Sequence, residues 1–92
     1  MPRKSEVLYT GGDGSSIQNA VVIEGATSPT EGIRAENDYI SRILGPQNKS
    51  WTKHKQRLII KDDIPYELIE AKLPDNNTRA FFFNIKSFFA SI

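Results

Sequence analysis

Cysteine is absent from this 92-residue sequence, and histidine, tryptophan and methionine occur once each. Without cysteine there is no disulfide framework, no thiolate nucleophile and no cysteine-ligated metal. A fold that needs no cross-links is compatible with a reducing compartment, so we predict a cytoplasmic protein. Apolar runs are also short: the stretch Val7-Leu8-Tyr9 is followed at once by glycines, which predicts neither a signal peptide nor a membrane-spanning helix.

The composition is that of one small globular domain. Hydrophobic residues make up 38% of the chain and charged residues 25%, which is typical of neither a disordered nor a membrane protein. A chain of this length leaves no room for a second hydrophobic core. We therefore predict a single domain over residues 1–92, with residues 1–5 flexible.

Charge is distributed unevenly along the chain, although the net charge is only +1. Residues 1–48 hold four basic and six acidic residues, and residues 62–92 hold three basic and five acidic residues. Residues 49–61 hold five basic residues and no acidic one. This basic segment indicates a surface for an anionic partner, although lysines on an edge strand also protect a sheet against aggregation.

A single long helix is predicted from Pro29 to Leu44. Ser28 precedes this proline and Glu31 follows it at the third helical position, which is the order of an N-cap, a first-turn proline and a capping-box acid. Gly45-Pro46 then ends the helix. Apolar residues between these ends recur at helical spacing, so we expect one face of the helix to pack on a sheet.

The remaining chain contains five extended segments, at residues 6–10, 20–23, 51–61, 66–73 and 79–85. The short turns at 62–65 and 74–77 predict that the last three strands form an antiparallel meander. The predicted fold class is α+β: one long helix packed on a four- to five-stranded, mostly antiparallel sheet. The C-terminal meander ends in a short helical turn, for which Ser87 is the expected N-cap.

All five phenylalanines lie between residues 81 and 89. Strand alternation places Phe81 and Phe83 on the face beneath the helix and Phe82 on the opposite face. We expect the terminal turn to return three more apolar side chains to the sheet: Phe88, Phe89 and Ile92.

The glycine-rich segment Gly12-Asp-Gly-Ser-Ser-Ile17 is close to a dinucleotide-binding fingerprint but lacks its third glycine and leads into a strand instead of a helix. We therefore predict a turn capped by Asp13 and by Ser15 or Ser16, with no cofactor. His54 is the only histidine, which excludes the usual metal-ligand clusters. We predict no metal site in this chain.

Acid and base pairs are also lacking in the sequence pattern. Glu67 and Glu70 are separated by an odd number of residues, so a regular strand projects them to opposite faces. No G-x-S-x-G turn offers a serine nucleophile. We accordingly predict no catalytic residues and a protein that is not an enzyme.

Two surfaces remain as candidates for binding. Alternation aligns four residues on one face of the basic strand: Trp51, Lys53, Lys55 and Arg57. Cations beside an aromatic ring are typical of proteins that bind single-stranded nucleic acid or another anionic partner, but the same residues also make an ordinary solvated face whose aliphatic stems cover the tryptophan.

The second candidate surface is a protein-contact surface on the sheet face away from the helix: Tyr66, Leu68 and Phe82. A single helix covers only one face of the meander. We expect this other face to be covered by the C-terminal segment, by the N-terminal strand or by another subunit.

The order of these segments resembles a family of small uncharacterised bacterial α+β proteins. The features that carry the resemblance are Gly11-Gly-Asp-Gly-Ser-Ser16, the strand Ala20-Val-Val-Ile23, a single helix with Ala35-Glu36 and Tyr39, and Phe83-Asn-Ile-Lys-Ser-Phe-Phe89. The resemblance covers nearly the whole chain. It implies a free-standing bacterial, cytosolic domain, and it implies no site residue.

Together these observations predict a non-enzymatic interaction domain, with a homodimer as one candidate assembly. The alternatives are binding of single-stranded nucleic acid or another anionic partner through residues 51–61, and an enzyme with a site that the sequence does not reveal. No cofactor and no membrane association are expected.

Overall fold

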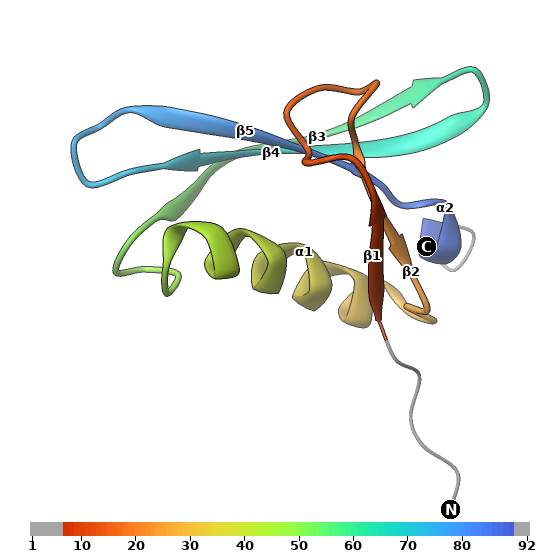
Figure 1. Ribbon diagram of the computed structural model, residues 1–92, viewed down its shortest axis with the longest axis horizontal. Coiled ribbons are helices and arrows are strands. Elements are labelled where there is room, and N and C mark those ends of the chain that lie inside the picture. Colours follow the sequence, from red (N-terminus) through yellow and green to blue (C-terminus); the bar gives the residue numbers. More distant parts are fainter. Residues whose placement is uncertain (1–6, 90–92) are drawn as a thin grey trace, which may run out of the picture.

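The protein folds as a five-stranded mixed sheet with one long helix beneath it (Figure 1). The computed structural model describes residues 7–89; the expectations for residues 1–5 and for Ile92 concern positions outside that range. The elements are β1 Leu8–Gly11, β2 Val21–Glu24, α1 Pro29–Leu44, β3 Thr52–Lys61, β4 Ile64–Lys72, β5 Thr78–Asn84 and α2 Lys86–Phe89. This arrangement confirms the predicted fold class.

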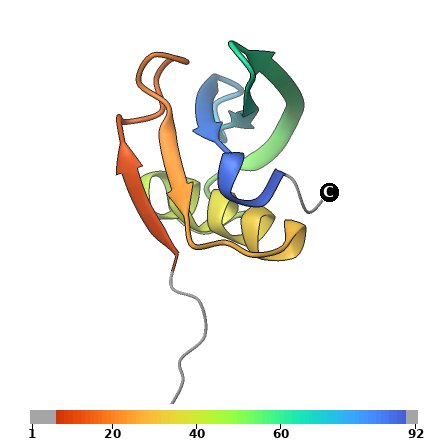
Figure 2. The same ribbon diagram turned by 90° about the vertical axis from the view of Figure 1, so that its right-hand side faces the viewer.

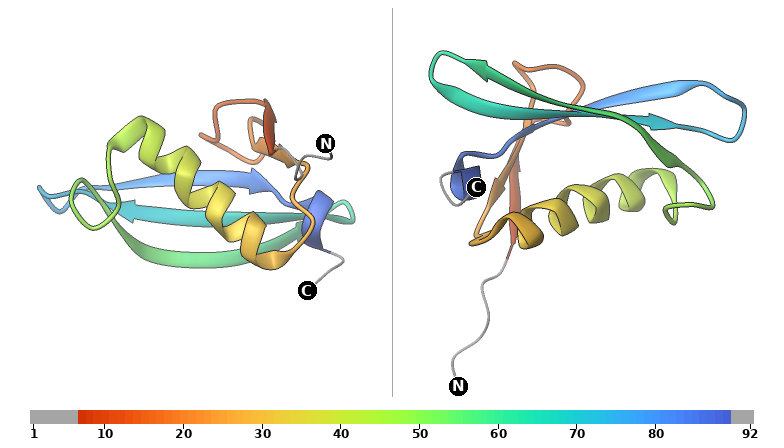
Figure 3. Two further views of the ribbon diagram at one scale, coloured as in Figure 1. Left: turned by 90° about the horizontal axis from the view of Figure 1, so that it is seen from below. Right: turned by 180° about the vertical axis from the view of Figure 1, so that it is seen from behind.

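The strand order is β1-β2-β5-β4-β3, and only the pairing of β2 with β5 is parallel. The last three strands form the predicted antiparallel meander. Seen from below, α1 crosses the sheet obliquely, and β3 runs along the edge opposite β1 (Figure 3). β3 and β1 are therefore the two edge strands.

Helix α1 has the ends that its capping residues predict. The Ser28 hydroxyl accepts a hydrogen bond from the Glu31 amide at 3.2 Å, and the Gly45 amide donates to the Ser41 carbonyl at 2.9 Å. Gly45 has φ 108°, a conformation that glycine adopts without strain. The Glu31 carboxylate accepts from the Thr27 amide at 2.7 Å, one residue earlier than a capping box requires.

The core lies between α1 and the lower face of the sheet. Phe81 and Phe83 are buried there as the alternation of β5 predicts, and Ile40 of α1 packs in the same cluster. Tyr39 makes edge-to-face contacts with both phenylalanine rings, at centroid distances of 6.5 and 5.8 Å. These aromatic contacts join the helix to the centre of the sheet.

The turn between β3 and β4 consists of two residues, Asp62 and Asp63, with φ 53° and 65°. Positive φ at both positions is the geometry of a two-residue hairpin whose twist matches the flanking strands. Pro65 follows within β4 and is buried, paired with Ile60 across the hairpin.

The C-terminal helical turn, α2, packs against the N-terminal end of α1 (Figure 2). Phe88 is buried against Gly32, where any side chain would overlap its ring. Ser87 was expected to cap this turn, and that prediction is wrong. The Asn84 side chain accepts from the Lys86 amide at 3.0 Å, while the Ser87 hydroxyl donates to the Ile23 carbonyl at 2.7 Å. Ser87 therefore ties α2 to β2.

The glycine-rich loop between β1 and β2 rises over the face of the sheet away from α1, here called the outer face (Figure 1). Its Asp13 carboxylate accepts hydrogen bonds from the Ser15 amide and hydroxyl, at 3.0 and 2.7 Å, which confirms the predicted turn. The Gly14 carbonyl accepts from the Phe82 amide at 2.8 Å. The loop is thus anchored to β5.

Candidate interaction surface on the outer strand of the meander

β3 is a ten-residue strand with a neighbour on one side only. It pairs with β4 from Thr52 to Lys61, and no strand within residues 7–89 pairs with its other edge. A long, unpaired edge exposes a row of backbone amide and carbonyl groups that can accept a further strand. This edge is the most extended unpaired backbone of the meander.

A register shift between Lys53 and Lys55 decides which way the side chains of β3 point. Lys53 pairs with the buried Ala71 and so lies on the α1 side of the sheet. Lys55 pairs with Glu70, and Arg57 with Leu68, on the outer face. An irregularity that inserts one residue, His54, moves the following side chains to the other face.

The predicted alignment of Trp51, Lys53, Lys55 and Arg57 on one face is therefore wrong for two of the four residues. Trp51 is only 1% exposed, and its indole N–H donates to the Gly45 carbonyl at 3.1 Å. Its side chain is part of the core beside the end of α1. Of the cations, Lys55 and Arg57 remain together on the outer face, whereas Lys53 is directed to the α1 side.

Leu58 and Ile60 are the exposed large apolar residues of the meander, at 49% and 55%. They pair with Glu67 and Pro65, which places them on the α1 side of the sheet. They are exposed although they lie on the α1 side, because the turn end of the β3–β4 hairpin rises away from α1 (Figure 1). Ile33 of α1 is also 44% exposed.

The predicted contact residues Tyr66, Leu68 and Phe82 do share the outer face. Leu68 pairs with Phe82, and Tyr66 pairs with Asn84. All three are half-buried. Part of their cover comes from the glycine-rich loop, because Ile17 lines one hollow together with Tyr66 and Asn84.

A second hollow, of about 370 Å³, lies on the meander between β3 and β4. It is lined by Lys55, Gln56, Arg57, Leu68 and Glu70. The Glu70 carboxylate lies 3.9 Å from His54 Nε2. The lining thus combines two cations with one apolar side chain, Leu68, and one carboxylate, Glu70.

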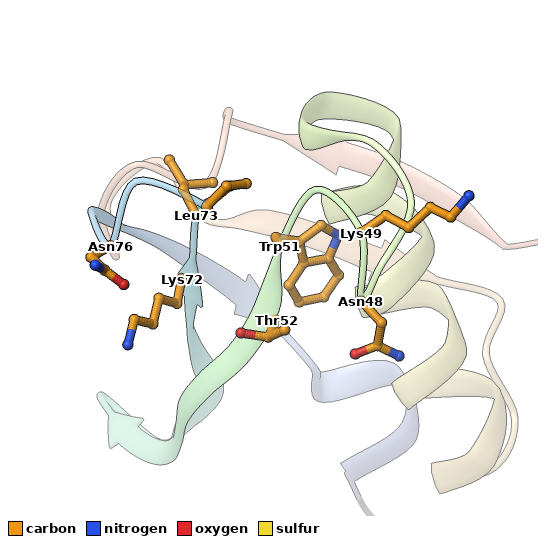
Figure 4. A pocket seen from close by; sticks show the side chains of 8 residues that line it. Asn48, Lys49, Trp51, Thr52, Lys72, Leu73 and Asn76 are labelled. Atoms are coloured by element: carbon orange, nitrogen blue, oxygen red, sulfur yellow. The ribbon is translucent and has the colours of Figure 1, made fainter.

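Another hollow, of about 320 Å³, lies where Trp51 begins the meander (Figure 4). Its lining includes Lys49 and Lys72, one on each side, and contains neither a carboxylate nor a histidine. Such a lining offers no acid and base pair. Asp13 bonds to Ser15, His54 lies beside Glu70, and neither of the two residues lines either of these two hollows.

The fold brings one carboxyl group of α1, that of Glu36, next to the carboxyl group of Glu67 in β4. Glu36 is fully buried, and neither oxygen makes a hydrogen bond of standard geometry. Burial and then the neighbouring Glu67 raise the pKa of Glu36 to about 8, while Lys53 opposes this shift. Glu36 is therefore protonated and neutral at pH 7.

Sequence reasoning missed both the exposed apolar pair on β3 and this carboxylate pair. The spacing of Leu58 and Ile60 indicated a shared face, but their exposure depends on how far the turn end of the β3–β4 hairpin stands from α1 (Figure 1). Glu36 precedes Ile40 by four residues, so the two share one face of α1. That spacing was the sequence signal that Glu36 faces the core.

No protein-family model, curated protein or solved structure matches the chain. The resemblance to small bacterial α+β proteins therefore stays a prediction. The bacterial origin and the cytoplasmic location that it implies stay predictions as well. Within residues 7–89, no helix has the length and apolar character needed to cross a membrane. The same residues contain no group of three side chains that could hold a metal ion.

Proposed function

We propose that the protein is a non-enzymatic interaction module that binds another protein through β3. The observation that supports this proposal best is an unpaired ten-residue edge strand on which Leu58 and Ile60 are half exposed. Proteins protect such an edge by shortening, twisting or covering it, or by bulges and charged side chains such as the lysines of β3, but these devices leave Leu58 and Ile60 exposed. Adjacent exposed apolar side chains on a long edge are characteristic of a binding surface.

Charge disfavours a homodimer formed by pairing β3 with itself. The strand carries four cations and no acidic residue: Lys53, Lys55, Arg57 and Lys61. Two copies side by side would place both sets against each other, which is destabilising when like charges are opposite or adjacent. A different protein with negative charge avoids this repulsion.

Site-specific photo-crosslinking tests the proposed function. A photoreactive residue replacing Leu58, with the protein expressed in its native host, is expected to give discrete adducts with another protein. Ile43 is the matched control, because it is 42% exposed but lies on α1. Equal adducts from positions 58 and 43, or none from position 58, would contradict the proposal.

Single-stranded nucleic acid on the outer face is a second candidate function, favoured by the hollow whose lining includes Lys55, Arg57 and Leu68. If it operates, a labelled oligonucleotide binds with an affinity that falls steeply with salt, because cations displace counterions from phosphates. Replacing Lys55 and Arg57 together by glutamine should then reduce the salt slope by about 2. Binding that is absent, or independent of salt, removes this candidate.

A further inference from the structure

Building on the function proposed above, we infer that the partner adds an extended segment with alternating acidic and apolar residues to the free edge of β3. The segment would continue the sheet as a sixth strand beside β3. Such strand addition uses backbone hydrogen bonds for affinity and alternate side chains for specificity.

The backbone of β3 is suited to this mode of binding. From Lys55 to Lys61 its register with β4 is unbroken, so this part of the strand presents a regular edge. The irregularity at His54 limits the usable edge at one end, and the Asp62-Asp63 turn limits it at the other. The length between them is that of an ordinary strand.

The side chains beside this edge differ between the two faces of the sheet. On the α1 side stand Leu58 and Ile60, which are about half exposed. On the outer face stand Lys55, Arg57 and Lys61, all exposed. Because strand side chains alternate with a period of two, a segment with apolar residues at every second position and acidic residues between them matches both faces at once.

The pair formed by the buried Glu36 and the half-buried Glu67 adds a further restriction. Glu67 is the cross-strand neighbour of Leu58, so it lies behind the apolar side of the edge, next to Glu36. An acidic residue of the partner beside Leu58 on that side would lie near Glu67, whereas on the outer face acidic residues would lie beside the exposed Lys55, Arg57 and Lys61. The partner's acidic residues are thereby favoured on one face, which disfavours any slip of the added strand by an odd number of residues.

A designed peptide tests this inference on the full chain. The probe is a fluorescein-labelled peptide of about eight residues that alternates glutamate and valine. One control peptide has the same composition in two blocks, which cannot place its charges on one face. A second control alternates lysine and valine. We expect saturable binding, measured by fluorescence anisotropy, of the alternating acidic peptide only.

Variants of the protein locate the site. We expect each of three variants to bind the peptide about tenfold more weakly or worse. They are Leu58→Asp, Ile60→Asp and the double variant Lys55→Gln/Arg57→Gln. The double glutamine variant changes only exposed side chains, so we expect it to fold. It therefore still tests the site if an aspartate variant does not fold. Ile43→Asp is the matched control and should leave the affinity unchanged, and circular dichroism verifies the fold of each variant.

Several results would overturn the inference. They are absence of binding, equal binding of the block peptide, and equal weakening by Ile43→Asp. A concentration-dependent doubling of mass that Leu58→Asp abolishes would instead assign the edge to a second copy of the chain. If the peptide fails while crosslinking from position 58 succeeds, the partner class is wrong and the proposed interaction function stands.

Discussion

Replacing Glu36 by glutamine is expected to stabilise the fold by about 3 kcal/mol at pH 7. In the folded protein Glu36 has its pKa raised to about 8 from an ordinary value of 4.5, because it is buried beside Glu67. The unfolded chain loses this proton near pH 4.5, so at pH 7 unfolding releases it. Glutamine has the same shape, is neutral at every pH and removes this driving force for unfolding.

The sign of the pH dependence follows from the same proton. Between about pH 4.5 and pH 8 the folded state binds the proton and the unfolded state does not, so stability falls as pH rises through this window. Below pH 4.5 Glu36 is protonated in both the folded and the unfolded state. The parent protein and the Glu36→Gln variant should therefore differ little in stability there. Urea unfolding at several pH values measures this dependence.

Asp38→Asn is the matched control for Glu36→Gln, because Asp38 lies on the same helix but is exposed. It removes one carboxylate without relieving burial, so we expect a change within about 0.5 kcal/mol. A Glu36→Gln protein that keeps the falling stability of the parent between pH 4.5 and pH 8 would show that another group titrates there.

Replacing Phe88 by alanine is expected to cost about 3 to 4 kcal/mol of stability. Its ring is 2% exposed and fills the space above Gly32, where α2 meets the first turns of α1. The substitution leaves a cavity between two elements that have few other contacts with each other. Thermal or urea unfolding of the single variant gives the value.

Gly32→Ala supplies the control. Its effect on folding stability should be unfavourable when Phe88 is present and favourable when Phe88 is replaced by alanine. In the parent protein the added methyl group overlaps Phe88 and destabilises the fold. In the Phe88→Ala background the overlap is gone, and alanine should stabilise the helix by up to about 1 kcal/mol relative to glycine. A destabilisation of equal size in both backgrounds would contradict the packing of α2 on α1.

Much of the fold was predictable because its signals are local. Ser28 and Gly45 set the ends of α1 through side-chain and backbone groups within one turn of each end. The turn at Asp62-Asp63 and the alternation of Phe81 and Phe83 likewise depend on neighbouring residues. Ser87 failed as a helix cap because its hydroxyl bonds to Ile23, a residue far away in sequence.

The candidate site was less predictable because it depends on tertiary geometry. A single inserted residue near His54 moves Lys55 and Arg57 away from the face of Lys53. Burial of Trp51 depends on the end of α1, whose carbonyl at Gly45 accepts its indole N–H. Exposure of Leu58 follows from the path of the β3–β4 hairpin, whose turn end rises away from α1 (Figure 1), and no local pattern specifies that path.

The central claim is that the free edge of β3 accepts another strand, and amide hydrogen exchange resolved by residue tests it most directly. Addition of the alternating glutamate–valine peptide is expected to slow exchange at alternate amides between Lys55 and Lys61, since only every second amide points to the free edge. Exchange in β1, the other edge strand, should stay unchanged. Protection that is absent from β3, or equal in β1 and β3, would contradict the claim.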